Sequence, residues 1–405
     1  MTDFIAVHIR SQPLREDRRA RLKEGDRGAR LEEVAGLFLK LGFIAFGGPA
    51  AHIALMRQEV VQRRKWLNDQ AFLDLLGASN LIPGPTSTEL AIYLGYTRAG
   101  PPGLVLAGLL FILPAMLMVT AFAWAYVQYG ATPQASAVLY GIKPVILAVV
   151  VQAIYGLLRA AIKSWQLAAI PLLTIVGYFA GVNLVFLLFG LAIAVAVVVN
   201  RSRLQPPFSQ AAFVLPPAAL DFAQNAPSGF ILGLLFLTFL KIGATLYGSG
   251  YVLLAFLHDD FVKGLGWLTD QQLLDAVAVG QFTPGPVFTT ATFIGYILDG
   301  IPGALVATVA VFLPSFVLVA AVYPWVPRLR ASPWTSGFLD GANAAAVGLM
   351  AAVAWQLAVA SIIDSLTVAL FVITVALLIR WKINSAWLVL AGGAVGLIAS
   401  AVRGS

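Results

Sequence analysis

The sequence predicts an all-α integral membrane protein, and its composition and the length of its apolar segments support that class. Hydrophobic residues make up 60% of the 405 residues and charged residues only 11%, with a mean hydropathy of +0.86. So few polar residues cannot cover a soluble surface, and lipid must therefore be the solvent for much of the chain. Apolar stretches of about 20 residues, enough to span a bilayer as helices, recur at residues 103–127, 135–158 and 303–326.

The chain lacks the motifs of soluble enzymes. It has no cysteine and only three histidines, His8, His52 and His258. It also contains no Gly-rich phosphate loop with a lysine, no His-Glu-x-x-His and no nucleophile elbow. The net charge of +7 comes from basic residues beside apolar segments, where the positive-inside rule places them, rather than from a nucleic-acid-binding surface. We expect a transporter with no cofactor, no metal site and no nucleic-acid partner.

Residues 1–33 are expected to form a basic cytoplasmic tail. They are crowded with charges between Arg15 and Arg30 and have no apolar core, unlike a secretory signal peptide. Two conformations are open for this tail: an amphipathic helix over residues 14–31 on the inner leaflet, or a solvated arm.

One long segment recurs about halfway along the chain, which predicts two homologous halves. The clearest matches, at a constant shift of 201, are Phe38 with Phe239, Lys40 with Lys241, Gly47 with Gly248, Trp66 with Trp267, Asp74 with Asp275, and Pro83-Gly84-Pro85 with Pro284-Gly285-Pro286. After a one-residue gap the shift becomes 200, as in Pro114 and Pro314. The predicted domains are an N-terminal membrane repeat (34–200), a linker (201–228) and a C-terminal membrane repeat (229–405).

Loop charges predict that the two halves are inverted relative to each other. Residues 57–65 carry three arginines and a lysine, whereas the corresponding residues 258–263 carry two aspartates and one lysine, and Arg98 corresponds to Asp299. Because basic loops prefer the cytoplasmic side, this reversal indicates an inverted-topology repeat, with an axis in the membrane plane.

The start of each half is expected to contain broken or re-entrant helical hairpins, and the first half shows the reason. Basic residues flank both 34–56 and 70–98, so each segment should leave and return on one membrane face. An inversion also requires an odd number of crossings between the halves. Residues 207–222 of the linker are therefore a candidate for one crossing, despite their weak hydrophobicity.

Glycine and proline interrupt both halves at two corresponding places and predict a binding site. One interruption is Gly47-Gly48-Pro49, matched by Gly248-Ser249-Gly250, and the other is the pair of Pro-Gly-Pro motifs. Proline lacks an amide hydrogen and glycine is a poor helix former, so each motif should open a helix and free backbone groups. Such openings are tolerated at membrane depth along a cavity. A packing kink or a surface loop is the alternative, but the correspondence between halves favours a site.

The first Pro-Gly-Pro motif is followed by a predicted helix start, with Thr86, Ser87 or Thr88 as cap and Glu89 in the first turn. Helix N-termini present uncommitted amides and a positive dipole end, so two of them at a pseudo-two-fold axis would hold a tetrahedral oxyanion. Helix capping alone also explains these hydroxyls. The expected anion-binding residues beyond the breaks are Asn80, Thr86, Ser87, Thr88, Gln281, Thr283, Thr289 and Thr290.

Ionisable residues within apolar segments are candidates for function. Lys40 and Lys241 share a repeat position and would supply a symmetric cation pair for an anion, or would instead snorkel to the interface. Glu89, which has no acidic counterpart, is a candidate proton carrier, a counter-ion to a lysine or a charge near the surface. His52 is a second candidate for proton coupling or a structural histidine.

Symmetry also fails at Lys143, whose counterpart is Asn343, and at Gly48-Pro49, so the two half-sites are not expected to be equivalent. An intramembrane enzyme or lipid-handling protein that uses Glu89 and Asp74 as acid and base is a less favoured alternative. Asp74 and Asp275 lie near segment starts, where helix caps and surface charges occur.

The motifs of both halves resemble the chromate ion transporter family in its long two-domain form, over nearly the whole chain from about Val34. The residues that carry the resemblance are Phe46-Gly47-Gly48-Pro49, Trp66-Leu67, Asn80-Leu81-Ile82-Pro83-Gly84-Pro85 and Phe282-Thr283-Pro284-Gly285-Pro286. The resemblance implies chromate efflux across a bacterial cytoplasmic membrane, driven by the membrane potential or the proton gradient. We expect alternating access between the repeats. Sulfate as cargo, import as direction and a homodimer as assembly remain open.

Overall fold

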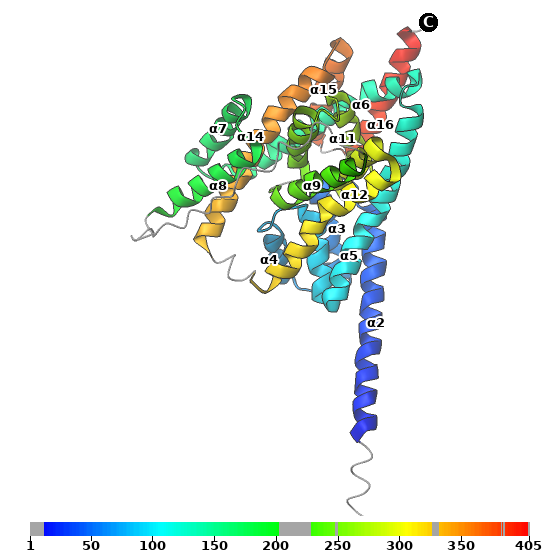
Figure 1. Cartoon of the computed structure of the whole chain (residues 1–405), viewed down its shortest axis with the longest axis vertical. Helices are drawn as coiled ribbons and strands as arrows, with labels where there is room; N and C mark the ends of the chain where they lie inside the picture. Colours follow the sequence, from blue (N-terminus) through cyan, green and yellow to red (C-terminus); the bar gives the residue numbers. More distant parts are fainter. Residues whose placement is uncertain are drawn as a thin grey trace, which may run out of the picture.

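The computed structural model is a bundle of helices with one long N-terminal helix that extends from it (Figure 1). It describes residues 12–201, 228–247, 250–325, 332–381, 383 and 385–403. Every regular element in these ranges is helical. The linker crossing expected at residues 207–222, and the predicted site residues Gly248 and Ser249, lie outside the described residues.

The helices of the two halves follow each other in the same order. The first half contains α2 (Gln12–Ile44), α3 (Gly48–Arg57), α4 (Asp69–Ser79), α5 (Thr86–Tyr129), α6 (Pro133–Ala161), α7 (Trp165–Phe179) and α8 (Leu184–Val199). The second half contains α9 (Ser228–Thr245), α10 (Leu253–Leu257), α11 (Asp270–Phe282), α12 (Thr290–Val322), α14 (Pro333–Ser361), α15 (Ser365–Trp381) and α16 (Ser385–Arg403). Short π and 3-10 turns, Gln58–Arg63, Gly250–Val252, His258–Gly264, Val287–Thr289 and Tyr323–Trp325, join some of them.

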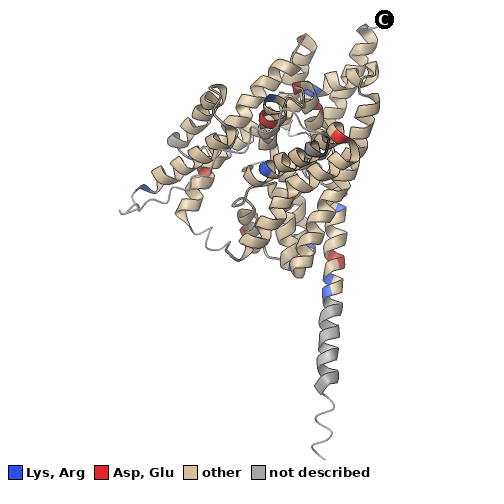
Figure 2. Ribbon diagram, in the orientation of Figure 1, with Lys and Arg blue, Asp and Glu red and all other residues tan. Residues whose placement is uncertain are grey.

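Five helices are long and apolar enough to cross a membrane, which confirms the predicted class. They are Thr86–Tyr129, Pro133–Arg159, Val287–Val322, Pro333–Ser361 and Ser385–Val402. Lysine, arginine and acidic residues are sparse over the bundle (Figure 2). Large apolar side chains such as Phe186 and Trp387 are exposed on its outside, as expected for a surface that faces lipid.

The first helix does not stop at the boundary predicted between tail and membrane repeat. α2 runs without a break from Gln12 to Ile44, and Arg98, at the turn of α5, binds Glu33 of this helix at 2.6 Å. The basic segment from residue 12 onward is therefore helical and continuous with the first apolar helix.

Both halves contain a helical hairpin that the sequence analysis does not resolve. α5 turns sharply at Ala99 and Gly100, and α12 turns at Asp299 and Gly300, where both glycines have a positive φ. The two legs touch at paired glycines, because a Cβ on Gly95 would lie 2.2 Å from the Gly103 carbonyl oxygen. The same holds for Gly295 and Gly303. Each Pro-Gly-Pro motif therefore begins the short leg of a hairpin.

Helices of one half pack on helices of the other, in a reciprocal manner. α8 lies along α14, α16 lies along α6, and the two hairpin helices α5 and α12 lie against each other. Small residues allow the close approach: Gly141 of α6 meets the backbone of Gly392 in α16, and Gly341 of α14 meets the backbone of Ala192 in α8. In Figure 1 the long leg of α5 ascends from its bend while that of α12 descends from its bend. The halves thus form one interlocked body.

Candidate functional site

Each Pro-Gly-Pro motif donates a backbone hydrogen bond to the other half, and the two bonds are reciprocal. We call the place where these contacts occur the crossing. The Gly84 amide donates to the Leu246 carbonyl at 2.8 Å, and the Gly285 amide donates to the Ala45 carbonyl at 2.9 Å. Leu246 and Ala45 occupy the same repeat position, just after α9 and α2. Each motif of one half is therefore held by the opened helix end of the other half, at a local pseudo-two-fold axis.

Glycine is required at the centre of both motifs. Gly84 has φ +136°, and a Cβ there would lie 2.3 Å from Glu89 Oε1 and 2.6 Å from Ser315 Oγ. Gly285 has φ +89°, and its Cβ would lie 2.8 Å from the Ala115 Cβ. Ala115 and Ser315 are repeat equivalents, so the same close approach is present twice with different side chains.

A polar network surrounds the first-half side of the crossing. His52 Nε2 lies 2.9 Å from the Ala45 carbonyl oxygen, which also accepts from Gly285, and its Nδ1 lies 3.3 Å from Ser87 Oγ. Since a carbonyl only accepts, the ring carries its proton on Nε2 and accepts from Ser87 at Nδ1. Burial lowers the pKa of His52 to about 4, and its backbone bond opposes this only in part. The ring is therefore neutral at neutral pH.

Glu89 is fully buried in the same region. Its Oε1 accepts from Ser315 Oγ of the second half at 3.4 Å. Within the described chain, Glu89 Oε2, Thr88 Oγ1 and Tyr93 OH are buried without a hydrogen-bond partner. Buried polar atoms are usually paired because leaving them unpaired costs free energy. These atoms therefore mark a place where a proton, a water or a ligand belongs.

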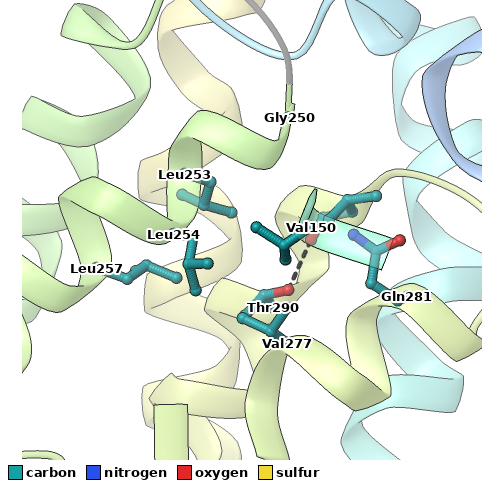
Figure 3. Close-up of a pocket in the computed structure, with 9 residues that line it drawn as sticks. Val150, Gly250, Leu253, Leu254, Leu257, Val277, Gln281 and Thr290 are labelled. Atoms are coloured by element: carbon teal, nitrogen blue, oxygen red, sulfur yellow. Dashed lines mark hydrogen bonds between the residues drawn. The ribbon is translucent and has the colours of Figure 1, made fainter. Parts of the chain in front are cut away.

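The second-half side of the crossing has a small pocket with less polar walls (Figure 3). Gly250, Leu253, Gln281 and Thr290 line it together with Val150 of the first half, and its volume of about 10 Å³ is enough for about one water. Gln281 Nε2 is buried there without a partner among the described residues. The pocket thus combines a predicted amide donor with two of the helix interruptions.

The predicted threonine donors of the second half are already used within their own turns. Thr283 donates to Val279 O at 3.0 Å, Thr289 to Pro286 O at 2.8 Å and Thr290 to Val287 O at 2.8 Å. The predicted cap is also wrong, because α5 starts at Thr86 with Pro85 as its N-cap and with no side-chain cap bond. The hydroxyls of Thr283, Thr289 and Thr290 therefore stabilise the break in the second half.

The expected cation pair is instead two separate ion pairs. Lys40 binds Glu59 at 2.7 Å, and Lys241 binds Asp260 at the corresponding place in the second half. Arg63 also binds Glu59 at 2.8 Å. The hydrogen bond from Lys40 is the main cause that lowers the pKa of Glu59, whereas burial raises the pKa of Asp260 against the opposing effect of Lys241. Both lysines are thus engaged by carboxylates of their own half.

Lys143 forms a contact between the halves that the sequence analysis missed. It lies 3.4 Å from Asp275 Oδ1 and also binds Gln271, while Tyr126 donates to Asp275 Oδ2 at 2.9 Å. Asp275 is only 3% exposed. It is neither a cap nor a surface charge, contrary to expectation, and the caps of α4 and α11 are Asn68 and Thr269.

The structure places the other predicted residues around the breaks. Gly47 and Gly48 have φ of +100° and +75° and, with Pro49, they start α3. Asn80 ends α4 on an exposed position. Ser315 and Tyr93 are the residues that sequence reasoning missed. The signal was available, because their repeat equivalents are the apolar Ala115 and Phe293.

Broken helices that cross between two interlocked repeats, within a bundle of membrane-spanning length, define a multi-pass membrane transporter rather than an enzyme. The chain belongs to the chromate transporter family. The family model described as "Chromate transporter" matches residues 33–199 and again residues 233–397. The double match confirms the two homologous halves.

Similar proteins align with most of the chain. A "Chromate transport protein" of Cupriavidus metallidurans is 34% identical over 91% of this chain and 93% of its own length. A "Probable chromate transport protein" of Synechococcus elongatus is 35% identical over 87% of this chain and 91% of its own. A "Chromate transport protein" of Pseudomonas aeruginosa is 32% identical over 89% and 90%. No solved structure matches the chain.

Proposed function

We propose that this protein exports chromate from the cytoplasm by alternating access around the crossing of the two Pro-Gly-Pro motifs. The observation that carries this proposal is the reciprocal pair of hydrogen bonds from Gly84 and Gly285. It brings two helix starts from different halves to one buried place, which is the arrangement that many transporters use for an anionic substrate. The names of the relatives supply chromate as the cargo.

Backbone groups would hold the anion. The first amides of a helix have no carbonyl one turn earlier and lie at the positive end of its dipole, so the starts of α5 and of the turn Val287–Thr289 suit a tetrahedral dianion. Gln281 would add a side-chain donor, since its amide nitrogen is unpartnered in the described chain. Lys40 and Lys241 would not bind the anion. They would stabilise the fold through their ion pairs with Glu59 and Asp260.

Glu89 would couple the anion to a proton. Its carboxyl group lies against Gly84 at the crossing, and a carboxylate there would repel a dianion strongly in a dry interior. The anion therefore binds best when Glu89 carries a proton, and His52 with Ser87 offers a polar path beside it. One proton with one dianion leaves a net charge of −1, which a membrane that is negative inside drives outward by about 2.3 kcal/mol per 100 mV.

The inverted arrangement would allow the two halves to exchange roles. Support comes from the reversed loop charges, the reciprocal packing of α8 on α14 and of α16 on α6, and the opposite course of α5 and α12 in Figure 1. Rocking of one half against the other about the crossing would open the site alternately to each side.

Chromate accumulation in cells tests this proposal directly. Cells that carry the protein should accumulate less chromate than cells with an empty vector, and the difference should grow when sulfate is low if the two anions compete. Equal accumulation with the protein present in the membrane would contradict export.

Sulfate import is the second candidate, because sulfate has the same charge and shape and a site made of amides would not distinguish the metal. Flux of labelled sulfate and chromate in right-side-out and inside-out vesicles separates the two candidates by direction and by competition. Uptake of sulfate into right-side-out vesicles, without chromate export, would favour import.

A further inference from the structure

A pocket of about 550 Å³ opens on the first-half side of the molecule, between α3, α6, α15 and α16. Phe46 and Gly47 line one part of it, Gln152 and Arg159 of α6 another, and Leu378 and Ile379 of α15 a third. It is separate from the small pocket of Figure 3. Its walls combine the cation of Arg159, the amide of Gln152 and the hydroxyl residues Tyr155 and Ser385 with apolar side chains.

One part of this pocket adjoins the crossing. Phe46 and Gly47 directly follow Ala45, whose carbonyl accepts the hydrogen bonds from Gly285 and His52. Gly47 has φ +100°, which opens the chain between α2 and α3. A molecule in this pocket would therefore contact the chain one or two residues after Ala45, the first-half acceptor at the crossing.

Another part of the pocket holds an available cation. Arg159 is exposed near the end of α6, and its guanidinium lies 4.5 Å from the Tyr155 ring centroid. No carboxylate of the described chain pairs with it. Neighbouring Lys163, by contrast, binds Asp340 at 2.6 Å. Val149 and Arg159 both line the pocket, and ten residues of helix between them correspond to about 15 Å, so the pocket extends from the end of α6 into the bundle.

The symmetry-related place, lined by Tyr178 of the first half and by His258 and Gln356 of the second, is filled. Tyr178, the counterpart of Leu378, is buried, with its hydroxyl 3.1 Å from His258 Nδ1 and donating to Gln356 Oε1 at 3.0 Å. Gln356 takes the place of Gly156. The counterpart of Arg159 is Val359, an exposed apolar residue. The repeat therefore shows one open pocket with Arg159 at its end, and one filled place in which the Lys263 ammonium lies 4.0 Å from the Tyr178 ring centroid.

We propose that this pocket is the vestibule through which a divalent oxyanion reaches the crossing, with Arg159 as the residue that recognises it at the entrance. The inference rests on the proposed transport function. A guanidinium offers several donors in a planar fork, which matches the paired oxygens of a tetrahedral dianion. Gln152 lies between Arg159 and Val149 along the same helix and would pass the anion inward.

Initial rates of chromate flux in membrane vesicles test the role of Arg159. Arg159→Gln should raise KM about tenfold with Vmax within about twofold of wild type, because capture fails while the central site is intact. Arg159→Lys should restore part of the affinity. The matched control is Lys163→Gln, which removes a neighbouring cation outside the pocket and should leave KM unchanged. A KM for Arg159→Gln equal to that of wild type would overturn the vestibule.

A second variant tests the route rather than the charge. Leu378→Tyr places in the open pocket the side chain that fills its counterpart, and it should lower Vmax severalfold, whereas Leu378→Met should not. Unchanged flux in Leu378→Tyr would overturn the route. Wild-type vesicles that move no chromate would instead refute the proposed function, so the two failures are distinct. Amounts of each variant in the membrane are normalised by immunoblot.

Discussion

The two halves share a backbone and differ in the side chains around it. The Pro-Gly-Pro crossing, the glycine-closed hairpins and the lysine–carboxylate pairs occur in both halves. Around the crossing, however, His52 and Ser87 of the first half correspond to Leu253 and Phe288 of the second, and Glu89 corresponds to the neighbourhood of Thr289 and Thr290. The symmetric parts build the scaffold, whereas the ionisable side chains described at the crossing, His52 and Glu89, belong to the first half.

The same contrast holds for the routes to the crossing. One is open beside Arg159, and its counterpart is filled by Tyr178. Identical halves would give identical access to the crossing from both, and this difference removes that equivalence. Substitutions at equivalent positions of the two halves are therefore the sharpest tests of this difference.

The largest effect is expected from Gly84→Ala. The new methyl group would meet Glu89 Oε1 at 2.3 Å in a backbone with φ +136°, so we expect a loss of about 3–5 kcal/mol in the free energy of unfolding and no transport. Thermal unfolding in detergent and chromate flux measure the two effects.

Gly285→Ala and Gly100→Ala complete that comparison. Gly285→Ala meets only the Ala115 methyl group at 2.8 Å, and Gly100→Ala meets nothing within 4 Å although its φ is +68°. We expect the free energy of unfolding to fall by about 2–3 kcal/mol in Gly285→Ala. It should fall by about 1–2 kcal/mol in Gly100→Ala, which has the backbone cost alone. Equal losses at all three positions would show that contact at the crossing is unimportant.

The scaffold could be predicted from the sequence because its causes are local or repeated. Apolar length, the shift of 201 residues and the paired Gly-Pro breaks each leave a pattern. The side-chain partners could not be predicted, because Lys40 finds Glu59 and Lys143 finds Asp275 only when helices distant in sequence pack together. The turn at Gly100 falls between the predicted segments 70–98 and 103–127, but the packing of its two legs depends on the contact of Gly95 with Gly103 and could not be predicted.

Glu89→Gln should remove proton coupling and keep the anion site. Glutamine has nearly the same shape and stays neutral, so each chromate would move without a proton and carry two charges instead of one. We expect chromate flux to lose its dependence on pH, and charge per chromate, measured by electrode currents on proteoliposomes, to rise about twofold. The counterpart Thr290→Val should leave both quantities unchanged. Unaltered pH dependence in Glu89→Gln would exclude Glu89 from coupling.

Lys143→Met should destabilise the contact between the halves. It leaves the buried Asp275 carboxylate without its cation, a change that costs about 2–4 kcal/mol in the free energy of unfolding. Asn343→Met, at the equivalent position, should cost less than about 1 kcal/mol. The double variant Lys143→Met with Asp275→Leu should regain much of the loss, since no charge is then left buried. If the double variant does not regain stability, the broken ion pair is not the cause of the loss in Lys143→Met.

The smallest effects are expected at the paired lysines. In Lys40→Ala, Glu59 keeps Arg63 at 2.8 Å and Arg64 at 3.5 Å, so the loss at pH 7 should be about 0.5–1 kcal/mol. In Lys241→Ala, Asp260 loses the cation that opposes its burial, and the loss should be about 1–3 kcal/mol.

The response of these two variants to pH should have opposite signs. The pKa of Glu59 is lowered in the fold, so its charge stabilises the native state above its ordinary value of 4.5 and that stability is lost as the pH falls. The pKa of Asp260 is raised, so its contribution is present at low pH and is lost as the pH rises through the raised value. Acidification from pH 7 to 5 should therefore restore part of the melting temperature of Lys241→Ala, and should not do so for Lys40→Ala. Parallel melting curves against pH would mean that the two ion pairs are equivalent, and that the asymmetry of the halves is confined to the crossing and its routes.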